Sequence, residues 1–161
     1  MILAGLKELN SEIPNLKIII KLHPTDAKNN IPDVDIINLP DSFTIMHKTP
    51  SFVELLKVGD ILVIDEPSTS LIQSVVTKKP LFVLNSHHRL IQEAEERLIK
   101  RAVVKDNPKD LIDTLKDYII NDVYCADVHD NTFSYYYSDP YGDGNLYERA
   151  SVFINQTYEL K

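Results

Sequence analysis

The chain has few of the residues and motifs that mark several common protein classes. It contains one cysteine, Cys125, among 161 residues, so an internal disulfide is excluded and a reducing compartment is expected. No apolar run approaches the roughly 20 residues needed to span a bilayer. Residues 1–5 also lack the basic start and long apolar core of a signal peptide. We therefore expect a cytoplasmic location.

The four glycines form none of the familiar nucleotide-binding or nucleophile motifs. The absence of Gly-x-Gly-x-x-Gly and of Gly-Lys-Ser/Thr argues against a dehydrogenase and a P-loop NTPase. No Gly-x-Ser-x-Gly elbow supports a hydrolase triad. With 17 basic against 24 acidic residues, the net charge is -7, so no overall field favours nucleic acid as a partner. An anion site would have to be built from helix ends and a few placed side chains.

What the sequence does contain is a regular alternation of apolar runs and amphipathic segments, typical of an α/β fold. Strands are expected at 17–22, 35–39, 61–65, 81–85 and 102–105, and helices at 2–12, 50–58, 68–78, 88–101, 108–121 and 145–157. Residues 122–143 are expected to form an irregular loop. We expect a single domain over 1–161: a Rossmann-like, doubly wound parallel sheet of about five strands with helices on both faces.

The usual order of a doubly wound sheet, 3-2-1-4-5-6, adds an expectation about neighbouring strands. The five expected strands correspond to the second through sixth, so the absent strand is the central one. Either the strand ending at Leu22 pairs directly with the strand ending at Asp65, or a gap persists that another chain fills. We expect direct pairing, because an open slot leaves N–H and C=O groups unpaired.

The most informative segment is 59–70, where an apolar strand runs into a turn with three hydroxyl side chains that opens a helix. Pro67 breaks the chain, and Ser68, Thr69 and Ser70 follow it. The free N–H groups and positive dipole end of such a helix lie at the edge of the sheet where open α/β folds bind ligands. The segment predicts a phosphate site. Serine is also a preferred helix cap, so a turn that binds nothing is the alternative.

Other polar residues are expected at the same edge of the sheet. His23 ends the strand 17–22, where an imidazole could donate to a phosphate oxygen or be satisfied by nearby backbone. Asp65 and Glu66 could contact a ribose hydroxyl or act as a base. Ordinary loop solvation or capping is the favoured interpretation of this pair, since carboxylates repel phosphate.

Two further groups of residues leave their roles open. His87, His88, Glu93 and Glu96 do not complete a ligand set at fixed spacing, so no metal site is expected. The Tyr-rich run at 133–137 could stack on a sugar or a base, or cover an edge of the core.

Taken in order, several segments resemble one family signature: Lys-Leu-His-Pro at 21–24, the strand and serines at 59–70, and Lys-Pro-Leu-Phe-Val-Leu at 79–84. They resemble the carboxyl-terminal, nucleotide-binding half of GT-B-fold transferases, especially the capsule polysaccharide and CDP-glycerol glycerophosphotransferase group. Residues 143–149 are similar to the Asp-Gly and Arg pattern near the end of those enzymes. The resemblance covers roughly residues 16–155.

The resemblance implies four residues that hold the diphosphate of a nucleotide-linked donor: His23, Ser68, Thr69 and Ser70. Asp65 and Glu66 are further candidate donor contacts. It implies transfer of a glycosyl or glycerophosphoryl group in surface polysaccharide synthesis, with the donor as substrate and no cofactor or metal. The family's acceptor-side half, which usually supplies the catalytic base, has no counterpart here. No catalytic residue is therefore assigned, and a truncated or partial enzyme, inactive in isolation, is expected.

Two other functions stay open. One is a catalytically inactive nucleotide-binding or regulatory module. The other is an interaction domain like a flavodoxin or a response regulator, for which the Asp65-Glu66 pair without a matching lysine is a poor fit. Oligomer formation, and peripheral membrane association through a missing domain or partner, also stay open.

Overall fold

The computed structural model describes residues 2–22, 39–87, 89–138, 141, 143, 145 and 147–152. The chain forms an α/β fold with parallel strands. Its helices are α1 (Ile2–Glu12), α2 (Phe52–Val58), α3 (Thr69–Val75), α4 (Gln92–Arg101), α5 (Pro108–Asn121) and α6 (Thr132–Tyr137). Its strands are β1 (Ile18–Lys21), β2 (Phe43–Met46), β3 (Leu62–Ile64), β4 (Leu81–Leu84) and β5 (Val103–Lys105).

The strands form two small parallel sheets rather than one. The larger sheet has the order β3-β4-β5, with Val63 opposite Phe82 and Val83 opposite Val104. The smaller sheet pairs β1 with β2, with Ile19 opposite Thr44. The βαβ unit expected from residues 61 to 85 is confirmed.

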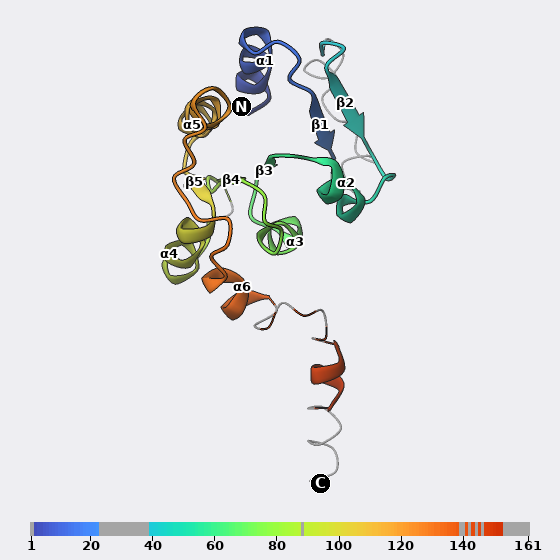
Figure 1. Cartoon of the computed structure of the whole chain (residues 1–161), viewed down its shortest axis with the longest axis vertical. Coiled ribbons are helices and arrows are strands. Elements are labelled where there is room, and N and C mark those ends of the chain that lie inside the picture. Colours follow the sequence, from blue (N-terminus) through green and yellow to red (C-terminus); the bar gives the residue numbers. More distant parts are fainter. Residues whose placement is uncertain are drawn as a thin grey trace.

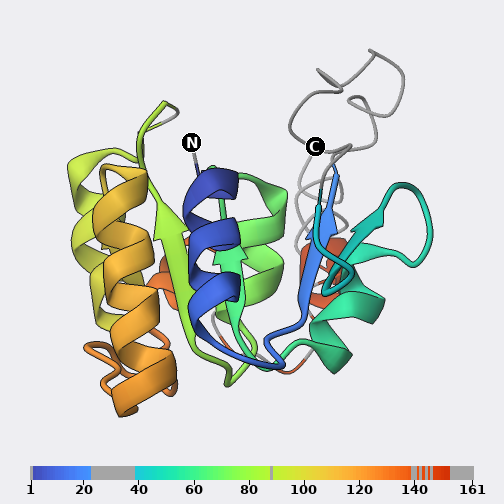
Figure 2. The ribbon, with the colours of Figure 1, turned by 90° about the horizontal axis from the view of Figure 1, so that it is seen from above.

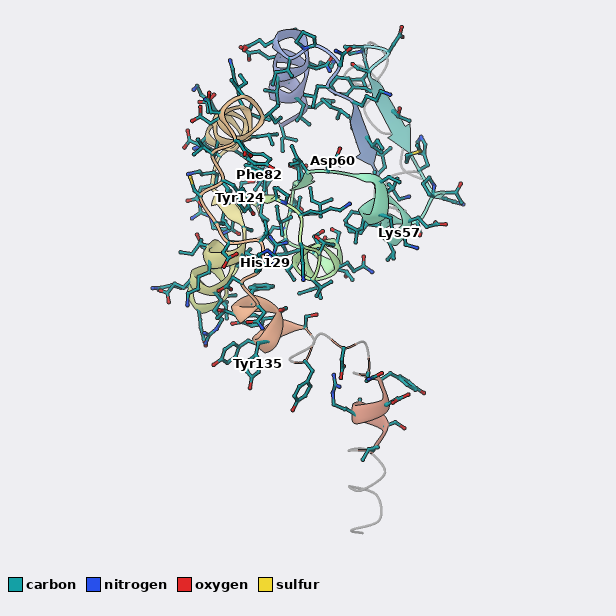
Figure 3. The ribbon with its side chains drawn as sticks, in the orientation of Figure 1. Lys57, Asp60, Phe82, Tyr124, His129 and Tyr135 are labelled. Atoms are coloured by element: carbon teal, nitrogen blue, oxygen red, sulfur yellow. The ribbon has the colours of Figure 1, made fainter. Side chains whose placement is uncertain are left out.

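Helices cover both faces of the larger sheet, which gives three layers (Figure 1). Side chains of β4 alternate between the faces, as the pleat of a strand requires. Leu81 and Val83 join a core cluster with α3 and α4, whereas Phe82 and Leu84 join a second cluster with α1 and α5. All four side chains of β4 are buried, because apolar layers cover it on both sides. Figure 3 places Tyr124 next to Phe82, and their ring centroids are 5.8 Å apart.

Two cations, the half-buried Lys79 and the buried Arg101, hold helix C-termini against the sheet. Nζ of Lys79 donates to the carbonyl oxygens of Leu56, Lys57 and Gly59 at the end of α2, at 2.7, 3.2 and 2.5 Å. The Arg101 guanidinium donates in the same way around the end of α3. These carbonyls have no intrahelical donor, so the cations satisfy them and lie at the negative end of each helix dipole.

The expected direct pairing of the strand ending at Leu22 with the strand ending at Asp65 is wrong for the described residues, because β1 pairs with β2 instead. The strand β2 was not predicted, since its four residues carry too short a pattern. The strand expected at 35–39 lies outside the described residues except for Leu39, which is not in a strand.

The expected irregular loop at 122–143 contains the helix α6, which corrects that prediction. Its sequence, Thr-Phe-Ser-Tyr-Tyr-Tyr, is not rich in strong helix formers. Tertiary packing stabilises it, since Phe133 is only 2% exposed and joins the core cluster of α3 and α4.

Two other helices differ in extent from the sequence predictions. The helix expected at 88–101 begins only at Gln92. Residues 89–91, just before it, are not helical, and the side chain of Asn85 accepts a hydrogen bond from Leu90 there. Of the closing helix expected at 145–157, residues 147–152 are helical and lie well apart from the layered part of the chain (Figure 1). No helix among the described residues has the length and apolar character to cross a membrane.

Candidate functional site

A hollow of about 420 Å³ opens where β3 and β4 end. Its walls come from the turn before α3, the segment between β4 and α4, and α6. They are largely apolar, and the polar groups among the lining residues include the Ser68 hydroxyl, the Arg89 guanidinium and the Tyr137 phenol. The carboxyl ends of parallel strands are the usual place for ligands in open α/β sheets.

The serine turn takes a different form from an ordinary helix cap. Ser68 is the N-cap of α3 with an extended backbone, but its side chain makes no capping hydrogen bond. Its Oγ instead lies 2.7 Å from Oγ of Ser70. The paired hydroxyls are accessible, and the Ser68 side chain does not cap the first amides of α3.

One basic side chain stands at the rim of the hollow. Arg89 lies in the segment between β4 and α4, and its side chain is 66% exposed. Its Nη2 lies 4.0 Å from Oδ2 of Asp106, which is also exposed. A surface pair at this distance contributes little, so the guanidinium can turn towards an anion at small cost. Sequence reasoning missed Arg89 because no motif surrounds it.

Asn85 shapes the wall that carries Arg89. It is 1% exposed; its Oδ1 accepts from N of Leu90 at 2.9 Å and its Nδ2 donates to Oε2 of Glu95 at 3.0 Å. These bonds tie the end of β4 to the start of α4. Sequence reasoning missed Asn85, although a lone amide directly after four apolar residues signals a buried polar group that needs partners.

The carboxylates after β3 stand near the serine turn without lining the hollow. Asp65 is exposed; desolvation by the surrounding chain and the adjacent Glu66 raise its pKa, while His87 lowers it. This negative pair opposes binding of phosphate close to it. Of the predicted site residues that the structure describes, Ser68 is the one that lines the hollow.

Two other predicted residues, Thr69 and Ser70, lie next to Ser68 but do not line the hollow. Ser70 contacts Ser68 through its hydroxyl, and Thr69 is exposed beside them. His23 lies outside the described residues. Among the described residues, no cluster of three His, Cys, Asp or Glu side chains could hold a metal ion.

The side chains of the Tyr-rich run at 133–137 lie in different environments. Phe133 is buried in the core, and Tyr137 lines the hollow with its ring centroid 4.9 Å from that of Phe133. The guanidinium of Arg97 lies 3.7 Å from the centre of the Tyr136 ring. Tyr135 points away from the layered part of the chain (Figure 3) and is 55% exposed.

The Asp-Gly and Arg pattern near the end of the chain forms a local structure away from the hollow. Nη1 of Arg149 donates to both carboxylate oxygens of Asp143, at 2.8 and 2.9 Å. The backbone N–H of Asn145 donates to the same carboxylate, and these bonds hold the pKa of Asp143 below its usual range.

Comparisons with known proteins give no information about the role of the site. No family model matches the chain, and neither the curated proteins nor the solved structures contain a significant match to it.

Proposed function

We propose that the chain is the donor-binding domain of a GT-B-like glycosyl- or glycerophosphotransferase of surface polysaccharide synthesis, and that it works in the cytoplasm. The observation that carries the proposal is the hollow at the ends of β3 and β4. Ser68 and Arg89 line it, the Ser68 hydroxyl pairs with that of Ser70 beside it, and the Ser68 side chain leaves the start of α3 without a cap. The resemblance of the chain to that enzyme group supports the same function.

In this proposal the donor's diphosphate binds at the serine turn. The hydroxyls of Ser68 and Ser70 and the first amides of α3 donate to its oxygens, and Arg89 supplies the opposite charge. The apolar wall and Tyr137 pack against the nucleoside or the transferred group. A hollow of about 420 Å³ falls within the usual range for small-molecule sites. We include His23 in the diphosphate site on the strength of the resemblance.

The proposed role is to hold the donor and to stabilise the negative charge of the departing diphosphate. No residue is assigned as catalytic base, so transfer requires an acceptor-side domain or partner. We also propose that the two observed sheets, β1-β2 and β3-β4-β5, are parts of one Rossmann-like, doubly wound sheet.

Titration calorimetry with CDP-, UDP- and GDP-linked donors tests the binding step. One donor should bind, and the double variant Ser68→Ala/Ser70→Ala should weaken that binding by about 1–3 kcal/mol, the range for lost hydrogen bonds to a charged partner. Ser11→Ala is the matched control, because its exposed hydroxyl donates to Glu8 O within α1, away from the hollow. Unchanged affinity in the double variant would remove the serine turn from the site.

A turnover assay tests the partial-enzyme interpretation. The isolated chain should bind donor but form no transfer product with any polysaccharide acceptor, since no base is assigned. Donor-dependent product from the chain alone would overturn this interpretation. Binding that persists without turnover after the acceptor-side partner is added would favour the regulatory module instead.

A further inference from the structure

A buried amide stands behind the part of the hollow that carries Arg89. Asn85 follows β4 directly and is 1% exposed, and it is not among the residues that line the hollow. Arg89, Leu90 and Ile91 do line it, and their segment joins the carboxyl end of β4 to the start of α4 (Figure 2). Asn85 can therefore influence a bound ligand only through the residues that it holds in place.

Two hydrogen bonds fix the orientation of the Asn85 side chain. Its Oδ1 accepts from N of Leu90 at 2.9 Å, and its Nδ2 donates to Oε2 of Glu95 at 3.0 Å. A backbone N–H can only donate and an ionised carboxylate can only accept, so neither partner tolerates the reversed amide. The backbone N–H of Asn85 donates to Lys105 O at 2.8 Å, which extends the pairing of β4 with β5. The amide therefore ties Leu90 to the sheet.

The backbone that follows Arg89 is fixed at two successive residues. Leu90, which comes next, is held by Asn85. The carbonyl oxygen of Ile91 accepts from N of Ala94 and N of Glu95 at the start of α4, at 3.0 and 3.1 Å. The Arg89 side chain itself is 66% exposed. A fixed backbone below a free guanidinium reduces the entropy that is lost when the guanidinium binds an anion.

We propose that Asn85, oriented by Glu95, is a positioning residue that holds Arg89 at the rim of the hollow for an anionic ligand. This inference rests on the proposed function, in which Arg89 is the cation that faces the diphosphate of the donor. The contribution of Asn85 to binding passes through Arg89. An amide with a purely structural role would affect binding in the same way whether or not the guanidinium is present.

Titration calorimetry of the full chain with inorganic pyrophosphate tests this dependence. Arg89→Met should weaken binding by about tenfold or more, through the loss of a charge-assisted contact. Asn85→Ala removes both side-chain bonds without changing the net charge, and should weaken binding by about threefold or more, because the segment must then be ordered on binding. In the Arg89→Met background, Asn85→Ala should cause no further loss. If Asn85→Ala does not fold, Asn85→Ser replaces it, because the shorter side chain cannot reach Leu90 N.

A rescue variant tests whether the two hydrogen bonds are the cause. Asn85→Asp/Glu95→Gln exchanges donor and acceptor across the 3.0 Å bond and keeps the net charge. The new carboxylate can still accept from Leu90 N, so the affinity should return to within about twofold of the wild type. Asn121→Ala is the matched control, because that amide donates to the carboxylate of Asp117 in an exposed pair on α5, which does not line the hollow.

The outcomes separate this inference from the function on which it rests. The inference alone is overturned if the Asn85 variant binds pyrophosphate as tightly as the wild type, or if it weakens binding equally with and without Arg89. Failure of the exchanged pair to restore affinity would overturn it as well. If the wild type does not bind pyrophosphate, or if Arg89→Met binds it equally tightly, the proposed function is overturned at its cation and this inference with it.

Discussion

Arg101 is the residue whose burial demands most explanation. It is 1% exposed, and its Nε donates to Val75 O at 3.1 Å while its Nη2 donates to the carbonyls of Thr77 and Lys79. Burial lowers its pKa, and Tyr124 acts in the opposite direction. The side chain joins the end of α3 to the start of β4, so it stabilises the βαβ unit rather than a ligand.

Replacing Arg101 with methionine should therefore destabilise the chain. The three carbonyls would lose their donor while staying largely buried, and a loss of about 2–4 kcal/mol in the free energy of unfolding is expected. Urea denaturation measures it. Lys109→Met is the control, because that ammonium forms an exposed i,i+4 pair with Asp113 and its loss should cost little. Equal losses in the two variants would contradict the role given to Arg101.

Asp65 makes the stability of the chain depend on pH. Because desolvation and the adjacent Glu66 raise the pKa of its carboxyl in the folded chain, the folded state binds the proton more tightly than the unfolded state. Stability is then lost as the pH rises from the usual Asp pKa through the raised value. Asp65→Asn should raise the melting temperature at neutral pH, and this gain should shrink in acid.

Thermal melts of the wild type and of Asp65→Asn across that pH range measure the predicted change in melting temperature. Asp60→Asn provides the comparison, since Asp60 lies just before β3, at the opposite end of the strand from Asp65 and Glu66, and its replacement should change little. A gain from Asp65→Asn that is the same at every pH would show that the carboxylate's charge is not the cause.

At the scale of elements, Gly5 is a point of close contact between α1 and α5. A Cβ added there would lie 2.6 Å from Cγ1 of Ile112, which is closer than real contacts allow. Gly5→Ala would gain about 0.5–1 kcal/mol of helix propensity. Overpacking should cost about 1–3 kcal/mol, so a net loss of stability is expected.

Chemical denaturation of a double-mutant cycle separates the two effects. Combining Gly5→Ala with Ile112→Ala should cost less than the sum of the single variants, because the second change removes the clashing atoms. Ala4→Gly, on the exposed side of α1, should cost only about 0.5–1 kcal/mol through propensity. A stabilising Gly5→Ala would mean that the helices can separate freely.

At the scale of the whole molecule, the two sheets should differ in how readily they open. β4 lies between two strands with all four side chains buried, whereas β1 has one paired edge and an exposed Ile19. Native-state hydrogen exchange should therefore show the paired amides of β4 protected up to global unfolding, and the paired amides of β1 exchanging through local opening at lower free energy. Equal protection in both strands would indicate one cooperative unit and contradict the separation of the sheets.

Part of the candidate site could be predicted from the sequence. The serine turn after β3 carries its own signal, an apolar run that ends in consecutive hydroxyl residues, and the structure keeps Ser68 and Ser70 together. Arg89 and Asn85 could not be found in this way, and Tyr137 was singled out only as a member of the Tyr-rich run at 133–137. Arg89 and Tyr137 reach the hollow from separate segments, and no spacing rule links residues that only the fold brings together.

The sequence by itself determined the βαβ unit, the long helix α5 and the start of α2, because their signals are local. The fully apolar run of β4, Pro108 in the first turn of α5, and the capping box of Ser51 with Glu54 each act within a few residues. Only the tertiary structure decided that β1 pairs with β2 rather than β3, that residues 132–137 are helical, and that a hollow lies beside Ser68. These outcomes depend on the burial of side chains and the pairing of backbone groups across long sequence separations, which a local pattern does not encode.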